Sequence, residues 1–188
     1  MRHPISIFLL SLGLAAGSAG AEQAFTVTSP DIQDNKPLQA AQVYQGFGCT
    51  GGNQSPQLDW SGAPAGTKSF AVSMYDPDAP TGSGWWHWVV YDIPASVHRL
   101  GRDAGRPGKL PDGAKHGRND FGTRNYGGAC PPPGDKPHRY VVTVYALKTD
   151  KLDVPPDATA AVAGFMTNAN KIASASFTAR YGRPAEKK

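Results

Sequence analysis

The sequence predicts a mostly β fold of short strands joined by many turns. The 188 residues include 22 glycines and 17 prolines, about a fifth of the chain, and this content disfavours a helical bundle. Hydrophobic residues make up 39% and charged residues 18%, a globular rather than a disordered composition. Several segments also alternate apolar and polar side chains with the period of two that a strand requires. At this length a single domain is expected.

Six segments are predicted as strands, over residues 24–29, 57–60, 68–75, 85–93, 138–148 and 172–180. In the third of these, Phe70, Val72 and Met74 fall on one side of the strand, opposite serine, alanine and tyrosine residues. The fourth is nearly continuous in aromatic and β-branched residues, which is typical of a central strand buried on both faces. The last two segments alternate again with the same period.

One helix is predicted after the proline pair at positions 155–156. Asp157 can cap its N-terminus, since a carboxylate accepts hydrogen bonds from the free N–H groups of a first turn. Apolar residues then recur at i, i+3, i+4 and i+7, which predicts an apolar face formed by Val162, Phe165, Met166 and Ala169.

Residues 1–21 have the organisation of a cleaved export signal. A short basic start is followed by an apolar run at 5–14, and Ala19 and Ala21 form an A-x-A cleavage site. The apolar run is about ten residues, too short to span a bilayer. Residues 22–188 are therefore predicted to be one mature domain, periplasmic or secreted, with cleavage after Ala21 and no stable membrane insertion.

The charge balance argues against nucleic acid as a partner. The formal net charge is only +4, too small to drive nucleic-acid binding. Much of the positive charge lies in residues 99–124, which hold seven Lys or Arg against three Asp in a long segment predicted to be irregular. This segment is either a solvated basic loop or a surface that raises the local concentration of anions.

Two cysteines, Cys49 and Cys130, each lie in a glycine-rich stretch. In an oxidising compartment they are predicted to form one disulfide, with two separate free thiols as the alternative. No metal site is predicted from them, because the C-x-x-C spacing of such sites is missing.

Acids, histidines and prolines gather at predicted strand ends. Asp76 and Asp78 follow one strand, His87 lies in the next, and His138 and Tyr140 begin a third after a run of prolines. If the three strands are neighbours, these groups share one pocket. An imidazole beside a carboxylate can then donate a hydrogen bond to an anionic oxygen. The alternative interpretation is a core histidine with aspartates that only make turns.

Five blocks of the sequence, taken in order, resemble the phosphatidylethanolamine-binding protein family, and in particular its bacterial Raf-kinase-inhibitor-like branch of the YbhB/YbcL type. The blocks are G-C-T-G-G-N at 48–53, D-P-D-A-P at 76–80, W-H-W-V-V at 86–90, the stretch 120–128, and P-P-P-G at 131–134 leading to H-R-Y at 138–140. The similarity extends from about Phe25 to Arg183.

This resemblance implies an antiparallel β-sandwich with one or two short helices in its C-terminal half. It also implies a small anion pocket made of Asp76, Asp78, His87, Pro132, His138 and Tyr140. Its ligand is expected to be phosphate or a phosphoethanolamine-like headgroup.

The sequence therefore predicts a periplasmic, non-enzymatic binding protein for a small anionic ligand, without cofactor or metal. One alternative is a protein-interaction or inhibitor module acting on a protease, a kinase or a host partner, with residues 99–124 and the glycine-rich cysteine loops as its surface. Another is an enzyme in which the paired carboxylates and histidines bind a metal and hydrolyse a phosphoester.

Overall fold

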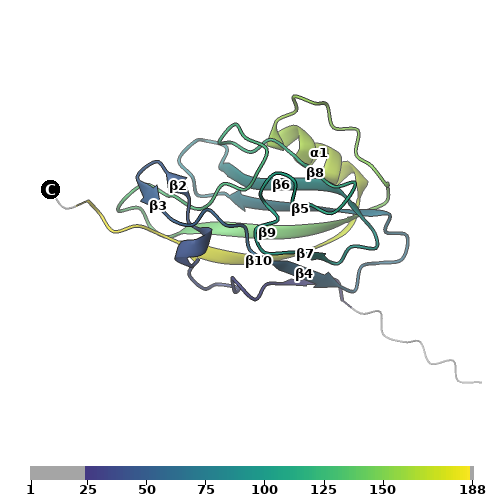
Figure 1. Ribbon diagram of the computed structural model, residues 1–188, viewed down its shortest axis with the longest axis horizontal. Coiled ribbons are helices and arrows are strands. Elements are labelled where there is room, and N and C mark those ends of the chain that lie inside the picture. Colours follow the sequence, from purple (N-terminus) through teal and green to yellow (C-terminus); the bar gives the residue numbers. More distant parts are fainter. Residues whose placement is uncertain (1–23, 187–188) are drawn as a thin grey trace, which may run out of the picture.

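The computed structural model describes residues 24–186 and shows a β-sandwich with one short α-helix (Figure 1). The predicted export signal lies outside the described residues. A five-stranded sheet has the order β10-β9-β5-β6-β8, with bounds β5 Ser69–Asp76, β6 Trp85–Pro94, β8 Lys115–His116, β9 His138–Leu147 and β10 Lys171–Tyr181. A three-stranded sheet has the order β1-β4-β7, with bounds β1 Thr26–Thr28, β4 Leu58–Ser61 and β7 Arg99–Leu100. All paired strands in both sheets are antiparallel, as predicted.

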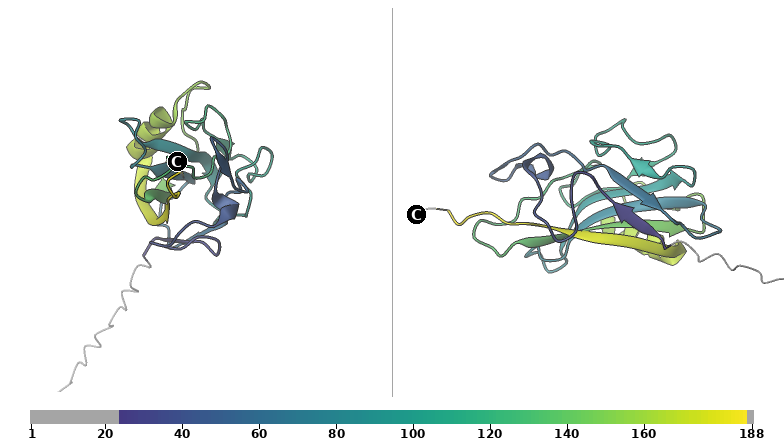
Figure 2. Two further views of the ribbon diagram at one scale, coloured as in Figure 1. Left: turned by 90° about the vertical axis from the view of Figure 1, so that its left-hand side faces the viewer. Right: turned by 90° about the horizontal axis from the view of Figure 1, so that it is seen from below.

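Three smaller elements complete the described chain. A 3-10 turn, η1, spans Ala40–Gln42, and a hairpin is formed by β2 (Gln45–Gly46) and β3 (Cys49–Thr50). Helix α1 spans Ala160–Asn170. Seen end-on, α1, the five-stranded sheet and the N-terminal strands follow one another as layers (Figure 2, left).

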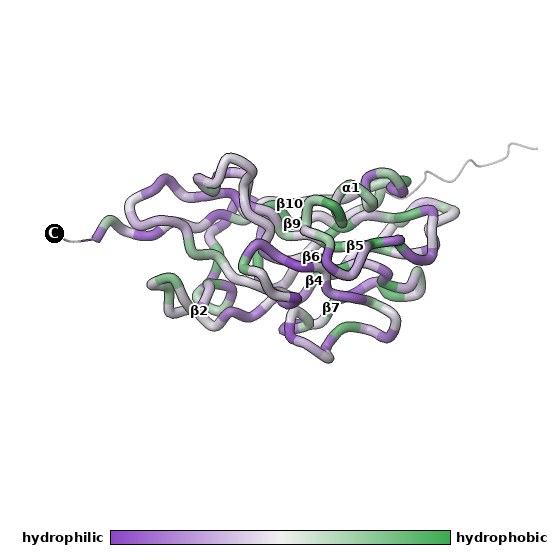
Figure 3. Tube along the Cα trace, turned by 90° about the horizontal axis from the view of Figure 1, so that it is seen from above, coloured by the Kyte–Doolittle hydropathy of each residue, from purple (hydrophilic) through white to green (hydrophobic). Residues whose placement is uncertain are grey.

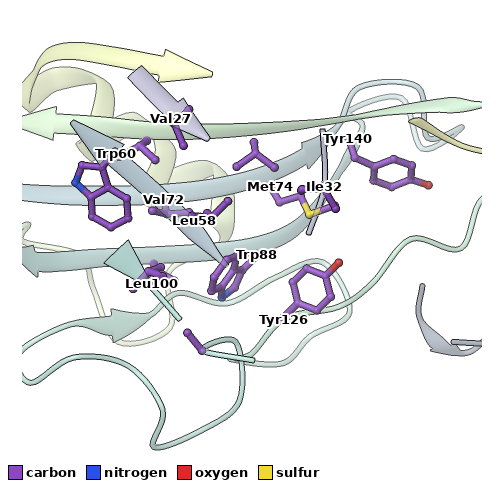
Figure 4. Packing of buried hydrophobic residues seen from close by; sticks show 14 of the residues in the cluster. Val27, Ile32, Leu58, Trp60, Val72, Met74, Trp88, Leu100, Tyr126 and Tyr140 are labelled. Carbon is purple, nitrogen blue, oxygen red and sulfur yellow. The ribbon is translucent and has the colours of Figure 1, made fainter. Parts of the chain in front are cut away.

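The main core lies between the two sheets. Phe70, Val72 and Met74 of β5 are buried there, as their alternation predicts. They pack with side chains of the smaller sheet such as Leu58 and Trp60, and Figure 4 shows several of these residues interleaved. Burial of this apolar surface is what holds the two sheets together.

Helix α1 covers the opposite face of the five-stranded sheet, but with a different side from the one the sequence predicts. Its buried residues are Ala160, Ala163 and Thr167, whereas Val162 and Phe165 are 40% and 70% exposed. The predicted apolar face is therefore wrong. Ala169 is exposed as well, and of the four residues predicted for that face only Met166 packs against the core.

Packing against large side chains explains the reversal. The sheet presents Trp86 and Tyr145 to the helix, and a Cβ placed on Gly164 would already be in van der Waals contact with the Trp86 ring, at 3.6 Å. Small residues therefore occupy the contact. In Figure 3, where the trace is coloured by residue hydropathy, hydrophobic residues recur along α1.

The helix also begins later than predicted. Thr159, rather than Asp157, is the N-cap, and its hydroxyl accepts a hydrogen bond from the Val162 N–H. Within residues 24–186, no helix is long and apolar enough to cross a membrane.

The basic segment 99–124 is more ordered than an irregular loop. It contains β7 and β8, and its Leu100 and Ala104 are buried in the core. Four of its basic side chains form ion pairs, which are Arg99–Asp59, Arg102–Asp31, Arg106–Asp103 and Lys115–Asp92. Much of the positive charge predicted for an anion-attracting surface is thus neutralised locally.

Cys49 and Cys130 form a disulfide that joins the β2–β3 hairpin to the loop preceding β9. The predicted pairing is confirmed, and it fits an exported protein, since disulfides persist in oxidising compartments.

Candidate functional site

A cavity of about 180 Å³ opens at one end of the five-stranded sheet. Strand β5 ends at Asp76, directly opposite Trp85 where β6 begins, and β9 begins beside it at His138. Because neighbouring strands run antiparallel, the end of one meets the starts of the other two. The cavity is lined by Phe47, Asp76, Ala79, Pro80, Thr81, Trp85, His87, Phe121, Cys130, Pro131, Pro132, His138 and Tyr140.

A β-bulge aims His87 into this cavity. Tyr75 pairs with Trp86 and Met74 with Trp88, so His87 is an extra residue without a partner on β5. Trp86 consequently packs on the side of α1 and Trp88 in the main core, although residues two apart in a regular strand share one face. Bulges often redirect a side chain next to a functional site.

The hydrogen bonds of His87 determine what it offers to a ligand. Its Nδ1 lies 2.8 Å from the carbonyl oxygen of Gly127 and 3.1 Å from that of Gly128. Carbonyls only accept, so Nδ1 carries the hydrogen. Burial lowers the pKa of His87 and keeps the ring neutral. Its Nε2 is therefore a buried acceptor, and it has no hydrogen-bond partner among the described residues.

Tyr140 supplies a donor beside it. The ring of Tyr140 lies edge-to-face with that of His87, with centroids 5.1 Å apart. Its hydroxyl is buried and finds no partner within residues 24–186. Burial, reinforced by the negative charge of Asp76, raises the pKa of Tyr140, so the hydroxyl stays protonated. In Figure 4, Tyr140 lies at one end of the core, and its hydroxyl points away from the other labelled core residues.

Asp76 and His138 form the second polar pair of the cavity. The His138 Nδ1 donates to Asp76 Oδ2 over 2.7 Å, and both side chains are almost fully buried. The other oxygen of Asp76 accepts the Asp78 N–H at 2.8 Å. On the outer side, His138 Nε2 lies 3.5 Å from Asp135 Oδ2. Asp76 therefore both orients the imidazole of His138 and holds the turn that follows β5.

Of the six residues predicted for the site, five line the cavity and Asp78 does not. Asp78 turns outward and accepts hydrogen bonds from the guanidinium and the backbone N–H of Arg139. The Arg139 guanidinium lowers the pKa of Asp78 to about 2. This pair ties the 76–80 turn to the start of β9.

Sequence reasoning missed the aromatic wall of the cavity, which consists of Phe47, Trp85 and Phe121. Phe121 belongs to a D-F-G triplet at 120–122, which resembles a kinase motif without any of its context. Phe47 is a hairpin residue with no distinguishing neighbours except two glycines. Within residues 24–186, no three His, Cys, Asp or Glu side chains are grouped as metal ligands.

Comparison with known proteins identifies the family of this chain. The family model described as phosphatidylethanolamine-binding protein matches residues 28–182. The chain belongs to the phosphatidylethanolamine-binding protein family.

Its relatives within this family include two proteins of Escherichia coli strain K12. The chain is 59% identical to the UPF0098 protein YbcL over 160 residues, covering 84% of this chain and 87% of YbcL. It is 47% identical to the UPF0098 protein YbhB over 154 residues, covering 81% of this chain and 97% of YbhB.

Solved structures of the phosphatidylethanolamine-binding protein family share the fold. The crystal structure of E. coli YbcL matches with a TM-score of 0.83 at 58% identity, covering 86% of this chain and 99% of YbcL. A homologue from Chlamydia trachomatis matches with a TM-score of 0.70 at 28% identity, covering 88% of this chain and 99% of that one.

Proposed function

We propose that this protein is a non-enzymatic binding protein, exported to the periplasm, whose cavity holds a small phosphate-like or carboxylate anion. One observation carries the proposal. Two buried polar atoms, His87 Nε2 and the Tyr140 hydroxyl, belong to the same cavity and have no partner within the described chain. An unsatisfied buried polar group costs about 1–3 kcal/mol, so a ligand that satisfies both is favoured.

The chemistry of the two atoms selects the ligand. The Tyr140 hydroxyl donates to an anionic oxygen, and a hydrogen bond to a charged group is roughly twice as strong as a neutral one. Neutral His87 accepts at Nε2, which fits an anion that still carries a proton, such as a phosphate monoanion. A fully ionised anion instead favours protonation of the His87 ring, which then donates from both nitrogens.

Export is part of the proposal, and the disulfide between Cys49 and Cys130 supports it. The family membership supports the choice of anion, since the family name itself refers to a phosphate-bearing headgroup.

Tyr140→Phe tests the function directly. Removing the hydroxyl should weaken the binding of inorganic phosphate about tenfold, the effect of losing one hydrogen bond to a charged group. It should leave the free energy of unfolding unchanged or raise it, because the deleted hydroxyl has no partner to lose. Calorimetric titration and urea unfolding measure the two quantities.

Tyr126→Phe is the matched control. Its hydroxyl is also buried but donates to the Gln42 carbonyl at 2.9 Å, so the variant should lose about 1 kcal/mol of stability and keep phosphate affinity. Wild-type affinity in Tyr140→Phe would refute the proposed site.

A further inference from the structure

A loop holds the outer edge of β6 next to the bulge at His87. Strand β8 pairs with β6 at only two residues, and the chain then continues as a loop along the same edge. Gly117 donates its N–H to the Val89 carbonyl at 2.9 Å. Further along the loop, Gly127 donates its N–H to the His87 carbonyl at 2.9 Å. The bulged part of β6 is therefore paired with a loop rather than with a strand.

Asp120, the first residue of the D-F-G triplet, binds the residue before His87 at two points. Its N–H donates to the Trp86 carbonyl at 3.0 Å, and its carboxylate accepts the Trp86 N–H at 2.7 Å. In a regular antiparallel pair, the backbone of the neighbouring strand makes both of these bonds. The side chain of Asp120 thus replaces a strand beside the bulge, and a hydrogen bond to its charged carboxylate is stronger than one to a carbonyl.

The position of the bulge decides which nitrogen of His87 carries the hydrogen. A neutral imidazole holds it on either nitrogen, and the hydrogen bond that one nitrogen makes selects the form. In His87 the carbonyls of Gly127 and Gly128 select Nδ1, at 2.8 and 3.1 Å. These contacts require the ring to lie at the correct distance from both carbonyls. A shift of β6 at Trp86 would therefore weaken the preference for the Nδ1–H form.

The two sides of this contact are anchored separately. On the acceptor side, Gly128 donates its N–H to Asn53 Oδ1 at 2.7 Å, which holds the carbonyls in place. On the other side, Asn119 is 3% exposed and closes the turn that carries Asp120. Its side chain accepts the N–H of one loop residue and donates to the carbonyl of another, both at 3.0 Å. Asp120 is therefore the link between this rigid turn and the strand that carries His87.

We propose that Asp120 is a positioning residue of this site, which holds the bulge so that His87 keeps its hydrogen on Nδ1 and leaves Nε2 free to accept. Asp120 does not line the cavity, so it acts through His87 and not on the ligand. The inference rests on the proposed function for the use that is made of Nε2. The tautomer of His87 can nevertheless be measured without any ligand.

The test compares Asp120→Ala with Asp120→Asn, and both variants should fold because Asp120 is exposed. Proton–nitrogen correlation NMR spectra at about pH 8, where the ring is neutral, report which nitrogen of His87 carries the hydrogen. In Asp120→Ala the Nε2–H form should appear, and inorganic phosphate should bind about tenfold more weakly, as for one lost hydrogen bond to a charged group. Asp120→Asn keeps an oxygen that accepts the Trp86 N–H, so it should keep the Nδ1–H form and the phosphate affinity.

Asp34→Ala is the matched control. Asp34 is also an exposed aspartate whose carboxylate accepts the N–H of a strand residue, Thr178 of β10, at 2.9 Å, but it does not line the cavity or contact β6. This variant should keep the Nδ1–H form and the phosphate affinity. An unchanged tautomer in Asp120→Ala, or the same switch in Asp34→Ala, would overturn the inference and leave the anion-binding function standing. Failure of the wild-type protein to bind phosphate would overturn the proposed function, while the tautomer comparison would still decide the role of Asp120.

Discussion

His87 owes its place in the cavity to one extra residue in strand β6. The bulge leaves it unpaired on β5 and turns it toward Tyr140, while Gly127 and Gly128 accept the hydrogen of its Nδ1. The residue is fully buried, yet one of its nitrogens has no partner within the described residues. That nitrogen belongs to the same cavity as the Tyr140 hydroxyl, which also lacks a partner within residues 24–186, and the pairing of the two supports the functional interpretation.

The charge state of His87 leads to a prediction on pH. Because burial lowers its pKa in the free protein, a bound anion should raise that pKa and draw a proton onto the ring. Affinity should then increase as the pH falls from about 8 to about 6, by up to about tenfold per unit for one proton. Sulfate is the suitable probe, since its own charge is constant over this range.

Other charged groups face the same cavity, so the assignment needs a control. Asp76 and His138 lie on its wall, and the charge of Asp120 also acts on His87. In His87→Gln the pH dependence of sulfate affinity should be flat. A slope that survives in this variant, measured by titration calorimetry in two buffers of different ionisation enthalpy, would assign the proton to another group.

At the scale of elements, the side chains of the five-stranded sheet determine which face of helix α1 packs against it. The five-stranded sheet offers large aromatic side chains, so the helix packs through Ala160 and Ala163 and leaves Phe165 in solvent. Close packing leaves no room for a larger residue at such a contact. Of the apolar residues that recur over 162–169, only Met166 packs against the core, and the other three lie on the exposed surface of the helix.

Two substitutions in α1 test which face of the helix packs against the sheet. Ala163→Leu should lower the free energy of unfolding by about 1–3 kcal/mol, because it overpacks the contact with the sheet. Phe165→Ala should change it by less than about 0.5 kcal/mol, as is usual for an exposed site. Urea unfolding gives both values. A loss of several kcal/mol in Phe165→Ala would mean that the helix packs through the face that the sequence predicts.

At the scale of the whole molecule, the disulfide and the C-terminal segment brace one end of the sandwich. The segment after β10 runs toward the β2–β3 hairpin (Figure 1). There Arg183 donates to the carbonyls of Pro131 and Gly48, each adjacent to one of the paired cysteines. Three distant parts of the chain thus hold the apolar side of the cavity, whereas strands β5, β6 and β9 hold its polar side.

Because different segments hold the two sides of the cavity, removal of the disulfide should lower the stability of the protein and leave its phosphate affinity nearly unchanged. Cys49→Ser with Cys130→Ser opens a closed loop of sequence separation 81, so stability should fall by about 2–4 kcal/mol in chemical unfolding. Phosphate affinity should change little, because His87 and Tyr140 lie on sheet strands. Reduction of the wild-type protein should give the same loss of stability. Loss of phosphate binding in the folded double variant would contradict this division.

Much of the fold was predictable because its signals are local. The period of two in β5 and β9 depends only on the alternation of side chains across a strand, and Phe70 and Val142 are buried as that pattern requires. The pairing of Cys49 with Cys130 followed from their number and the predicted export signal. Five of the six residues predicted for the candidate site line the cavity, and the order of Asp76 at the end of one strand, His87 in the next and His138 at the start of a third was visible in the sequence.

What the sequence could not determine depends on contacts between distant segments. Neither the bulge at His87 nor the outward turn of Asp78 toward Arg139 leaves a local signal, because each is decided by what packs beside it. The same holds for Phe121, which becomes part of the cavity only when its loop docks on β6. The sequence by itself determined the longer strands, the disulfide and most of the polar groups of the candidate site. The tertiary structure alone decided which of these side chains line one cavity. The direction of each side chain depends on which strands lie next to each other and on the room that neighbouring side chains leave.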